Sequence, residues 1–172
     1  MSKLLIVIDM QEDFVRGSLA NPAAEAIIPN IKKKIDKYLK NGDDIIFTRD
    51  THSVCYLDTP EGKKLPVEHC IKATKGWLVV DELCHPECQH SNKPTFGYKY
   101  WDGELTKEYD SIELVGTCTS ICVVSNAILI KTFYPDTPII VDASCCACVS
   151  EETHKAALTV MECCQIDVIN KE

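Results

Sequence analysis

Short apolar runs alternate along the chain with longer segments whose apolar residues recur at helical spacing. The first run, residues 4–8, contains no polar residue, which is typical of a strand buried on both faces of a parallel sheet. Further runs lie at residues 45–48, 111–115, 139–141 and 166–169, with a weaker candidate near residues 87–93. The pattern therefore predicts six strands.

Segments with helical periodicity lie between these runs. Over about residues 22–40, isoleucine or leucine recurs every fourth residue with lysines between, which predicts one amphipathic helix that ends at Gly42. A second helix is predicted over residues 120–133, and Ser150 is a suitable cap for a third. The buried face of this third helix is expected to consist of Ala156, Ala157, Val160, Met161 and Cys164.

This alternation of strands and helices predicts a three-layer α/β fold around a doubly wound, mostly parallel six-stranded sheet. No repeat, low-complexity segment or linker divides the sequence, so residues 1–172 are expected to form a single domain. In such sheets, ligands bind beyond the carboxyl ends of the strands, where the strand order reverses. With the order 3-2-1-4-5-6, that crevice lies between the first and fourth strands.

Charge and composition narrow the classes of function. The formal net charge of −8 repels phosphate backbones, which argues against nucleic acid or an anionic membrane as the main partner. No apolar run reaches the ~20 residues of a membrane span. The first three residues lead straight into a predicted strand without a signal-peptide layout, so we expect a cytoplasmic protein. Most of the 11 cysteines are then expected to be reduced thiols packed as small apolar groups.

Two reactive side chains are expected to meet at the crevice. Asp9 ends the first strand, and Cys122 lies in the first turn of the helix after the fourth strand. Helical N–H groups there stabilise a thiolate or an oxyanion, and a nearby carboxylate can take the thiol proton. Lys93, after the weak third strand, supplies a cation that would offset the repulsion between carboxylate and thiolate. Such residue types more often have only structural roles, as a loop cap, a core side chain and a solvated lysine.

A second polar group follows the second strand. Asp50 and His52 are separated by one residue, so their side chains point the same way in an extended segment. Glu61 and His69 lie in a long loop of residues 51–77, which we expect to be ordered and functional. Imidazole and carboxylate ligands together suit Zn²⁺, Mn²⁺ or Fe²⁺. The alternative is a polar loop held by hydrogen bonds of its own side chains.

Five segments carry a resemblance to a known family. They are Ile8-Asp9-Met10-Gln11-Glu12-Asp13-Phe14, Asp50-Thr51-His52, Pro66-Val67-Glu68-His69-Cys70, Lys93-Pro94-Thr95-Phe96 and Gly116-Thr117-Cys118-Thr119-Ser120-Ile121-Cys122-Val123. In this order, and over nearly the whole chain, they resemble the isochorismatase-like cysteine hydrolases and, within them, the nicotinamidases. The resemblance implies a small amide substrate, with nicotinamide converted to nicotinate and ammonia, and an assembly of two or four identical chains.

The resemblance also implies a role for each residue of the thiol site. Asp9, Lys93 and Cys122 would be catalytic, with Cys122 forming a thioester, Asp9 moving the proton and Lys93 holding the ion pair together. The backbone N–H groups of Cys118 and Cys122 would form the oxyanion hole. A cis peptide bond is implied between Thr117 and Cys118.

A divalent metal ion is the implied cofactor, with Zn²⁺ favoured over Mn²⁺ or Fe²⁺. Its ligands would be Asp50, His52, Glu61 and His69. The metal would bind the ring nitrogen of the substrate directly or through water, mainly to orient it. Phe14 and Phe96 would form apolar walls around the ring.

Three alternatives remain open at this point. A relative with the same thiol site could hydrolyse another small amide or a vinyl ether without metal ligands. A non-enzymatic thiol or metal-binding protein would rely on Cys84 and Cys88, although zinc sites prefer two residues between paired cysteines rather than three. A regulatory or structural domain would keep the fold with an inactive site. Oxidation could also join Cys118 and Cys122, which share one loop.

Overall fold

The structure, a computed structural model, describes residues 2–171. Its six strands form one sheet in the order β3-β2-β1-β4-β5-β6, and every neighbouring pair is parallel. The strands are β1 (Leu4–Ile8), β2 (Asp44–Asp50), β3 (Gln89–Lys93), β4 (Ile112–Thr117), β5 (Ile139–Ala147) and β6 (Asp167–Ile169). The predicted α/β class and strand order are therefore confirmed.

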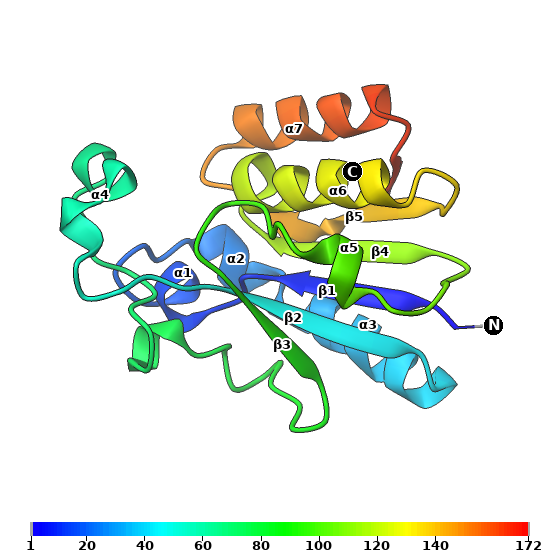
Figure 1. Ribbon diagram of the computed structural model, residues 1–172, viewed down its shortest axis with the longest axis horizontal. Coiled ribbons are helices and arrows are strands. Elements are labelled where there is room, and N and C mark those ends of the chain that lie inside the picture. The colour runs from blue at the N-terminus through cyan, green and yellow to red at the C-terminus, as the bar shows by residue number, and fades with distance from the viewer. Residues whose placement is uncertain (1, 172) are drawn as a thin grey trace.

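Helices cover both faces of this sheet (Figure 1). One face carries α1 (Glu12–Val15), α2 (Pro22–Ala26) and α3 (Ile28–Asn41), and the other carries α5 (Trp101–Glu104), α6 (Val124–Phe133) and α7 (Glu151–Cys163). Alternate residues of β1 enter the two cores, because Leu5 and Val7 pack toward α3 while Leu4 and Ile6 pack toward α6. Every side chain of β1 is buried, as its unbroken apolar run predicts.

The prediction of one helix over residues 22–40 is wrong, because α2 and α3 meet at Ile27. Pro29 lies in the first turn of α3, where its missing N–H removes a hydrogen bond that a continuous helix would need. The side chain of Asn21 caps α2 by accepting a backbone N–H. Gly42 ends α3 in a left-handed conformation (φ 73°), as predicted.

The buried face of α7 also differs from the predicted one. Of the five predicted positions, only Ala157 and Met161 are buried, and Leu158 is buried beside them. The other three, Ala156, Val160 and Cys164, are exposed. The helix packs on α6, β6 and the π-helical turn η3 (Thr119–Val123) at the edge of the molecule, so its outer positions meet solvent.

The long loop between β2 and β3 is ordered, as predicted. It contains two 3₁₀ turns, η1 (Tyr56–Asp58) and η2 (Lys75–Trp77), and the short helix α4 (Pro60–Lys64). Thr59 caps α4 by accepting the N–H of Gly62. In Figure 1, α4 stands away from the sheet, beyond the carboxyl ends of the strands. None of the helices within residues 2–171 is both long and apolar enough to cross a membrane.

Candidate active site

Three elements bring Asp9, Lys93 and Cys122 to the carboxyl edge of the sheet. Asp9 directly follows β1 with a positive φ of 48°, and Lys93 is the last residue of β3. Cys122 lies in η3, immediately after β4. Since β2 separates β3 from β1, the long lysine side chain has to reach across a strand to meet the other two.

Lys93 joins the other two residues. Its Nζ lies 2.6 Å from Asp9 Oδ2 and 3.5 Å from Cys122 Sγ, and it also donates to the carbonyl of Thr95 at 3.3 Å. Asp9 and Lys93 are completely buried, and Cys122 is 5% exposed. The predicted convergence of these three side chains is therefore present.

Thr48 on β2 orients the carboxylate of Asp9. Its hydroxyl donates to Asp9 Oδ1 at 2.7 Å and accepts the backbone N–H of Asp9 at 3.2 Å. The other oxygen, Oδ2, is paired with the Lys93 ammonium but has no aligned hydrogen-bond donor among the described residues. Because Thr48 occupies Oδ1, Oδ2 is the oxygen of Asp9 better placed to accept a proton.

The charges of the site follow from its burial. Burial raises the pKa of Asp9, and the attraction of Lys93 offsets this only in part. Burial and the nearby Asp9 carboxylate raise the pKa of the Cys122 thiol well above its usual range. Although burial opposes its charge, the pKa of Lys93 is raised because Asp9, Cys122 and Asp50 surround it. Lys93 lowers the pKa of both Asp9 and Cys122, as expected of a cation between them, but burial outweighs this attraction at both groups.

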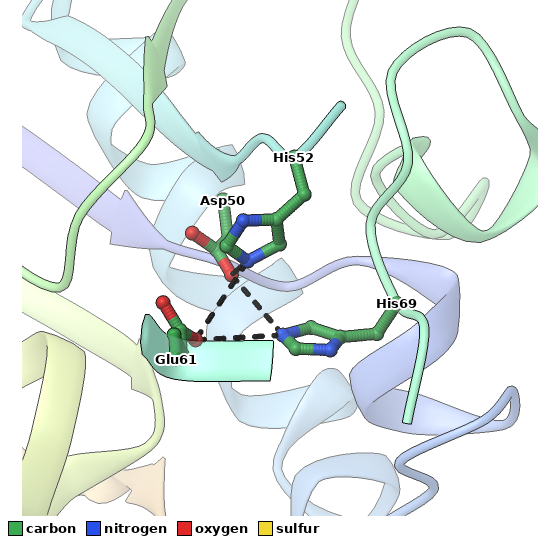
Figure 2. A group of neighbouring side chains, drawn as sticks. All are labelled: Asp50, His52, Glu61 and His69. Carbon is green, nitrogen blue, oxygen red and sulfur yellow. Dashed lines mark hydrogen bonds and ion pairs between the residues drawn. The ribbon is translucent and has the colours of Figure 1, made fainter. Parts of the chain in front are cut away.

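The second polar group also assembles as predicted. Figure 2 shows the side chains of Asp50, His52, Glu61 and His69 pointing toward one another. Asp50 ends β2, Glu61 comes from α4, and a bridge between His52 and Ile71 brings the two histidines together. Each of the four residues offers one ligand atom, and these atoms lie within 4.8 Å of one another.

The spacing of these atoms fits a divalent metal. His52 Nε2 lies 3.0 Å from Asp50 Oδ2 and 3.8 Å from Glu61 Oε1, and His69 Nε2 lies 3.5 Å and 4.0 Å from the same two oxygens. Ligands that sit about 2.1 Å from a tetrahedral centre are about 3.4 Å apart. The Nδ1 of His69 is 2.8 Å from the carbonyl of Val67, so its N–H donates there, and Nε2 is the ring nitrogen that faces the candidate metal position.

Asp50 connects the two groups. Its Oδ2 faces the histidines, while its Oδ1 lies 3.6 Å from Lys93 Nζ. Although burial opposes its charge, hydrogen bonds from His52 and His69 and the attraction of Lys93 hold the pKa of this carboxyl well below its usual range. Asp50 is therefore a carboxylate shared between the thiol site and the candidate metal site.

One cavity of about 610 Å³ opens onto both groups. Cys118, Cys122 and the three candidate ligands Asp50, Glu61 and His69 line it. Phe14 and Phe96 also line it, and Phe14 is tilted against the ring of His69 at a centroid distance of 5.6 Å. Reactive sulfur, candidate metal ligands and aromatic side chains thus share a space large enough for a small molecule.

The loop that carries the thiol has the implied backbone feature. The Thr117–Cys118 peptide bond is cis. The carbonyl of Cys118 then accepts the N–H groups of Ile121 and Val123, which closes η3 around Cys122. The use of the Cys118 and Cys122 N–H groups as an oxyanion hole stays a prediction.

Gln11 and Asp13 hold the candidate metal group in place. Sequence analysis assigned no role to either residue. Gln11 donates its side-chain N–H groups to the carbonyls of Asp50 and Trp77, both at 2.9 Å, and its Oε1 accepts the N–H of Asp50 at 2.7 Å. Asp13 Oδ2 accepts the N–H of Cys70, next to His69, at 2.7 Å. Both belong to the motif of residues 8–14, so that motif was the available signal.

A third such residue, Asn126, supports the thiol. Its Nδ2 donates to the carbonyls of Cys122 at 2.7 Å and Phe96 at 3.1 Å. Its Oδ1 accepts the N–H of Tyr98 at 2.8 Å and the indole N–H of Trp101 at 2.9 Å. One completely buried amide therefore ties η3 to the segment after Lys93. A single asparagine in a predicted helix gave no signal of this.

The alternative metal site around Cys84 and Cys88 is not assembled. Within residues 2–171, the Asp50 cluster is the only group of at least three histidine, cysteine or acidic side chains close enough to hold an ion.

Two further aromatic residues near the site, Tyr98 and Trp101, do not line the cavity. They are buried in the core on the α6 face.

Comparison with known proteins agrees with this geometry. A family model described as "Isochorismatase domain" matches residues 3–172. The chain is 29% identical over 178 residues to the "Uncharacterized isochorismatase family protein PncA" of Bacillus subtilis (strain 168), which covers 92% of this chain and 93% of that protein.

Solved structures share the fold over nearly the whole chain. The crystal structure of pyrazinamidase/nicotinamidase from Streptococcus mutans UA159 gives a TM-score of 0.86 at 29% identity, covering 98% of this chain and 100% of that one. The structure of the pyrazinamidase of Pyrococcus horikoshii in complex with zinc gives 0.87 at 24% identity, with coverage of 98% and 99%. Because the family model spans almost every residue, the chain belongs to the isochorismatase family.

Proposed function

We propose that this protein is a nicotinamidase-like amidohydrolase, which converts nicotinamide to nicotinate and ammonia through a thioester on Cys122. The observation that carries the proposal is the contact of Lys93 Nζ with both Asp9 and Cys122, on a cavity that also exposes a candidate metal group. The names of the Streptococcus mutans and Pyrococcus horikoshii relatives support the same class of substrate.

In this mechanism, the thiol of Cys122 loses its proton as its sulfur attacks the carboxamide carbon. Asp9 Oδ2 is the base, because its burial makes it a stronger proton acceptor than an exposed carboxylate. The N–H groups of Cys118 and Cys122 stabilise the oxyanion, and Asp9 returns the proton to the departing ammonia. Lys93 keeps the carboxylate in place throughout, and water then hydrolyses the thioester.

The candidate metal group serves to bind and orient the substrate. Asp50, His52, Glu61 and His69 would hold the ion, and an ion bound there supplies a positive anchor for the ring nitrogen of a pyridine-type substrate. Gln11 keeps the backbone of Asp50 in place, and Asp13 does so for the segment beside His69. These residues thereby set the distance between the anchor and the thiol.

The cavity wall favours an uncharged substrate. Among the described residues that line it, Asp50 and Glu61 are acidic and none is lysine or arginine. A substrate that carries carboxylates would meet like charge without a compensating side chain, and two carboxylate ligands already balance a divalent ion. This argues for a neutral aromatic amide over the alternative of an acidic vinyl ether.

Ammonia release from a panel of amides tests the proposal. We expect turnover of nicotinamide and pyrazinamide, and at least tenfold lower kcat/KM for N-carbamoyl amino acids, since their carboxylate costs more than about 1.4 kcal/mol beside Asp50 and Glu61. Turnover of carbamoyl compounds alone would show that the substrate class is wrong.

Removal of a metal ligand gives a second prediction. His69→Ala is expected to lower the metal content of the purified protein, measured by elemental analysis, from about one ion per chain to a small fraction, because metal sites of this kind need all their ligands. KM for nicotinamide should rise at the same time. His85→Ala, a change of a histidine outside the cluster, is the control and should retain the metal. Equal metal content in both variants would remove the ion from the proposal.

A further inference from the structure

A pair of thiols, Cys118 and Cys148, lies beside the same cavity, and of the two only Cys118 lines it. β4 and β5 are neighbours, and Thr117 pairs with Ala147 at their carboxyl ends. Cys118 and Cys148 are the next residues on each strand, so they leave the sheet side by side. Their Sγ atoms are 3.0 Å apart. Cys122 is not part of this pair, because its sulfur lies against Lys93.

Hydroxyl groups surround the sulfur of Cys148. Ser120 Oγ lies 3.1 Å from it and Thr153 Oγ1 lies 3.2 Å from it. Although burial opposes the charge, hydrogen bonds from these hydroxyls and from the Cys118 thiol lower the pKa of Cys148 to about 6. By contrast, burial and the hydrogen bond to Cys148 raise the pKa of Cys118 to about 11. At neutral pH the pair is thus a thiolate beside a thiol, which is the combination that forms disulfides.

The pair can be reached from the cavity. Cys118 is partly exposed and lines the cavity, while Val149, next to Cys148, is 83% exposed on the same rim. Cys148 itself is buried directly behind Cys118, so an oxidant as small as hydrogen peroxide would approach the pair from the side of Cys118 and Val149.

We propose that Cys118 and Cys148 form a peroxide-reactive dithiol, a modification site beside the cavity whose oxidation to a disulfide switches catalysis off. The disulfide does not depend on the proposed amidase activity, whereas the loss of turnover rests on it. Cys148 is the thiol of this pair that reacts first, because the hydroxyl groups of Ser120 and Thr153 lie 3.1 Å and 3.2 Å from its sulfur and can stabilise a thiolate.

The chemistry needs only hydrogen peroxide as oxidant. The Cys148 thiolate attacks one peroxide oxygen and breaks the O–O bond, which gives a sulfenic acid and a hydroxide that takes up a proton as water. The sulfur of Cys118 then attacks the sulfenic sulfur, so that an S–S bond forms and an S–O bond breaks. The Cys118 proton leaves with that oxygen as a second water. Two thiols lose two electrons in total, and a thiol reductant reverses the reaction.

The disulfide would disturb the loop that carries the nucleophile. The two sulfurs must approach from 3.0 Å to about 2.05 Å, which draws Cys118 toward β5. Cys118 supplies a proposed oxyanion N–H and part of the cavity wall. Since displacements of about 1 Å in a catalytic group can cost about 10²-fold in rate, we expect a loss of turnover of that order.

Peptide mapping of peroxide-treated protein tests the site directly. The full chain is treated with hydrogen peroxide at neutral pH, free thiols are blocked, and the protein is digested with trypsin without reduction. Cys118 then lies in residues 108–131 and Cys148 in residues 132–155. We expect these two peptides to be linked, with fragment ions that place the bond at Cys118 and Cys148, before any oxidation of Cys122 is detected.

Variants separate this pair from the other cysteines. Cys148→Ser should form no linked peptide, keep its basal activity and resist the loss of turnover that dithiothreitol reverses in the unchanged protein. Cys163→Ser, at an exposed cysteine of α7, is the matched control and should behave like the unchanged protein. If Cys148→Ser folds poorly, Cys148→Ala provides the same test, and the mapping of the unchanged chain needs no variant.

Three results would overturn the proposal. A linked peptide that persists without Cys148 would make Cys145 or Cys146 the partner. Oxidation of Cys122 ahead of the linked peptide would make the nucleophile the reactive thiol. Complete disulfide formation with full turnover would exclude the switch. A protein that hydrolyses no amide would still form the linked peptide, so failure of the proposed function is distinguishable.

Discussion

Cys122→Ala is expected to lower the kcat of amide hydrolysis by about 10⁴-fold or more, because removal of a nucleophile eliminates the covalent route altogether. Cys122 is the sulfur that contacts Lys93 and faces the cavity. Alanine removes only the sulfur atom and adds no group to the core, so the fold should be retained. The measurement is ammonia release under saturating nicotinamide, with circular dichroism to verify folding.

The control for this prediction is Cys164→Ala, at an exposed cysteine that follows α7. It should leave kcat within twofold of the unchanged protein, since exposed positions without partners rarely matter. Mass spectrometry after acid quenching should find a covalent acyl adduct on the unchanged protein and none on Cys122→Ala. Retention of turnover by Cys122→Ala would exclude the thioester mechanism.

Lys93→Met is expected to have the largest combined effect on stability and activity. The ammonium is completely buried, 2.6 Å from Asp9, and its loss leaves a buried carboxylate without its cation. Breaking one partner of a buried ion pair typically costs about 3–5 kcal/mol. Methionine fills the space but supplies no charge, so Asp9 would favour its protonated form and lose its capacity as a base. Turnover should therefore fall together with the free energy of unfolding.

Urea unfolding and ammonia release measure the two effects separately. Lys99→Met is the matched control, because this lysine is exposed on the segment that follows and stacks only over the ring of Tyr100. It should change the free energy of unfolding by less than about 0.5 kcal/mol. If Lys93→Met were as stable and as active as Lys99→Met, the buried ion pair could not be the centre of the site.

Local sequence pattern was sufficient for most of the fold. The unbroken apolar run of residues 4–8 predicted a central strand, and β1 is buried on both faces. Helix endings with a clear local signal, such as Gly42, were correct. The two errors have different causes. The apolar periodicity of residues 22–40 concealed a helix break that Pro29 marks locally, whereas the exposed outer side of α7 depends on its place at the edge of the sheet.

For the candidate site, the sequence predicted which residues take part but not how they are arranged in space. Asp9, Cys122 and three of the four candidate metal ligands stand in segments that resemble family motifs, so the chain alone nominated them, whereas Glu61 lies outside these segments. The pairing of Asp50 with Lys93 in strand register, and the reach of that lysine across β2 to Asp9, arise only when the strands are assembled. The register between strands that are distant in the sequence cannot be predicted from the spacing of residues within each strand.

The sequence by itself determined the strands of the sheet and the residue types of the reaction centre, because these follow from short-range hydrophobic pattern and motifs. Tertiary structure alone decided their acidities, since burial and not composition raises the pKa of the Cys122 thiol and of Asp9. It also decided which thiols meet. Cys118 stands four residues from Cys122 and thirty from Cys148, yet β4–β5 pairing places it against Cys148, because strand neighbours are set by hydrogen bonding across the sheet and not by separation along the chain.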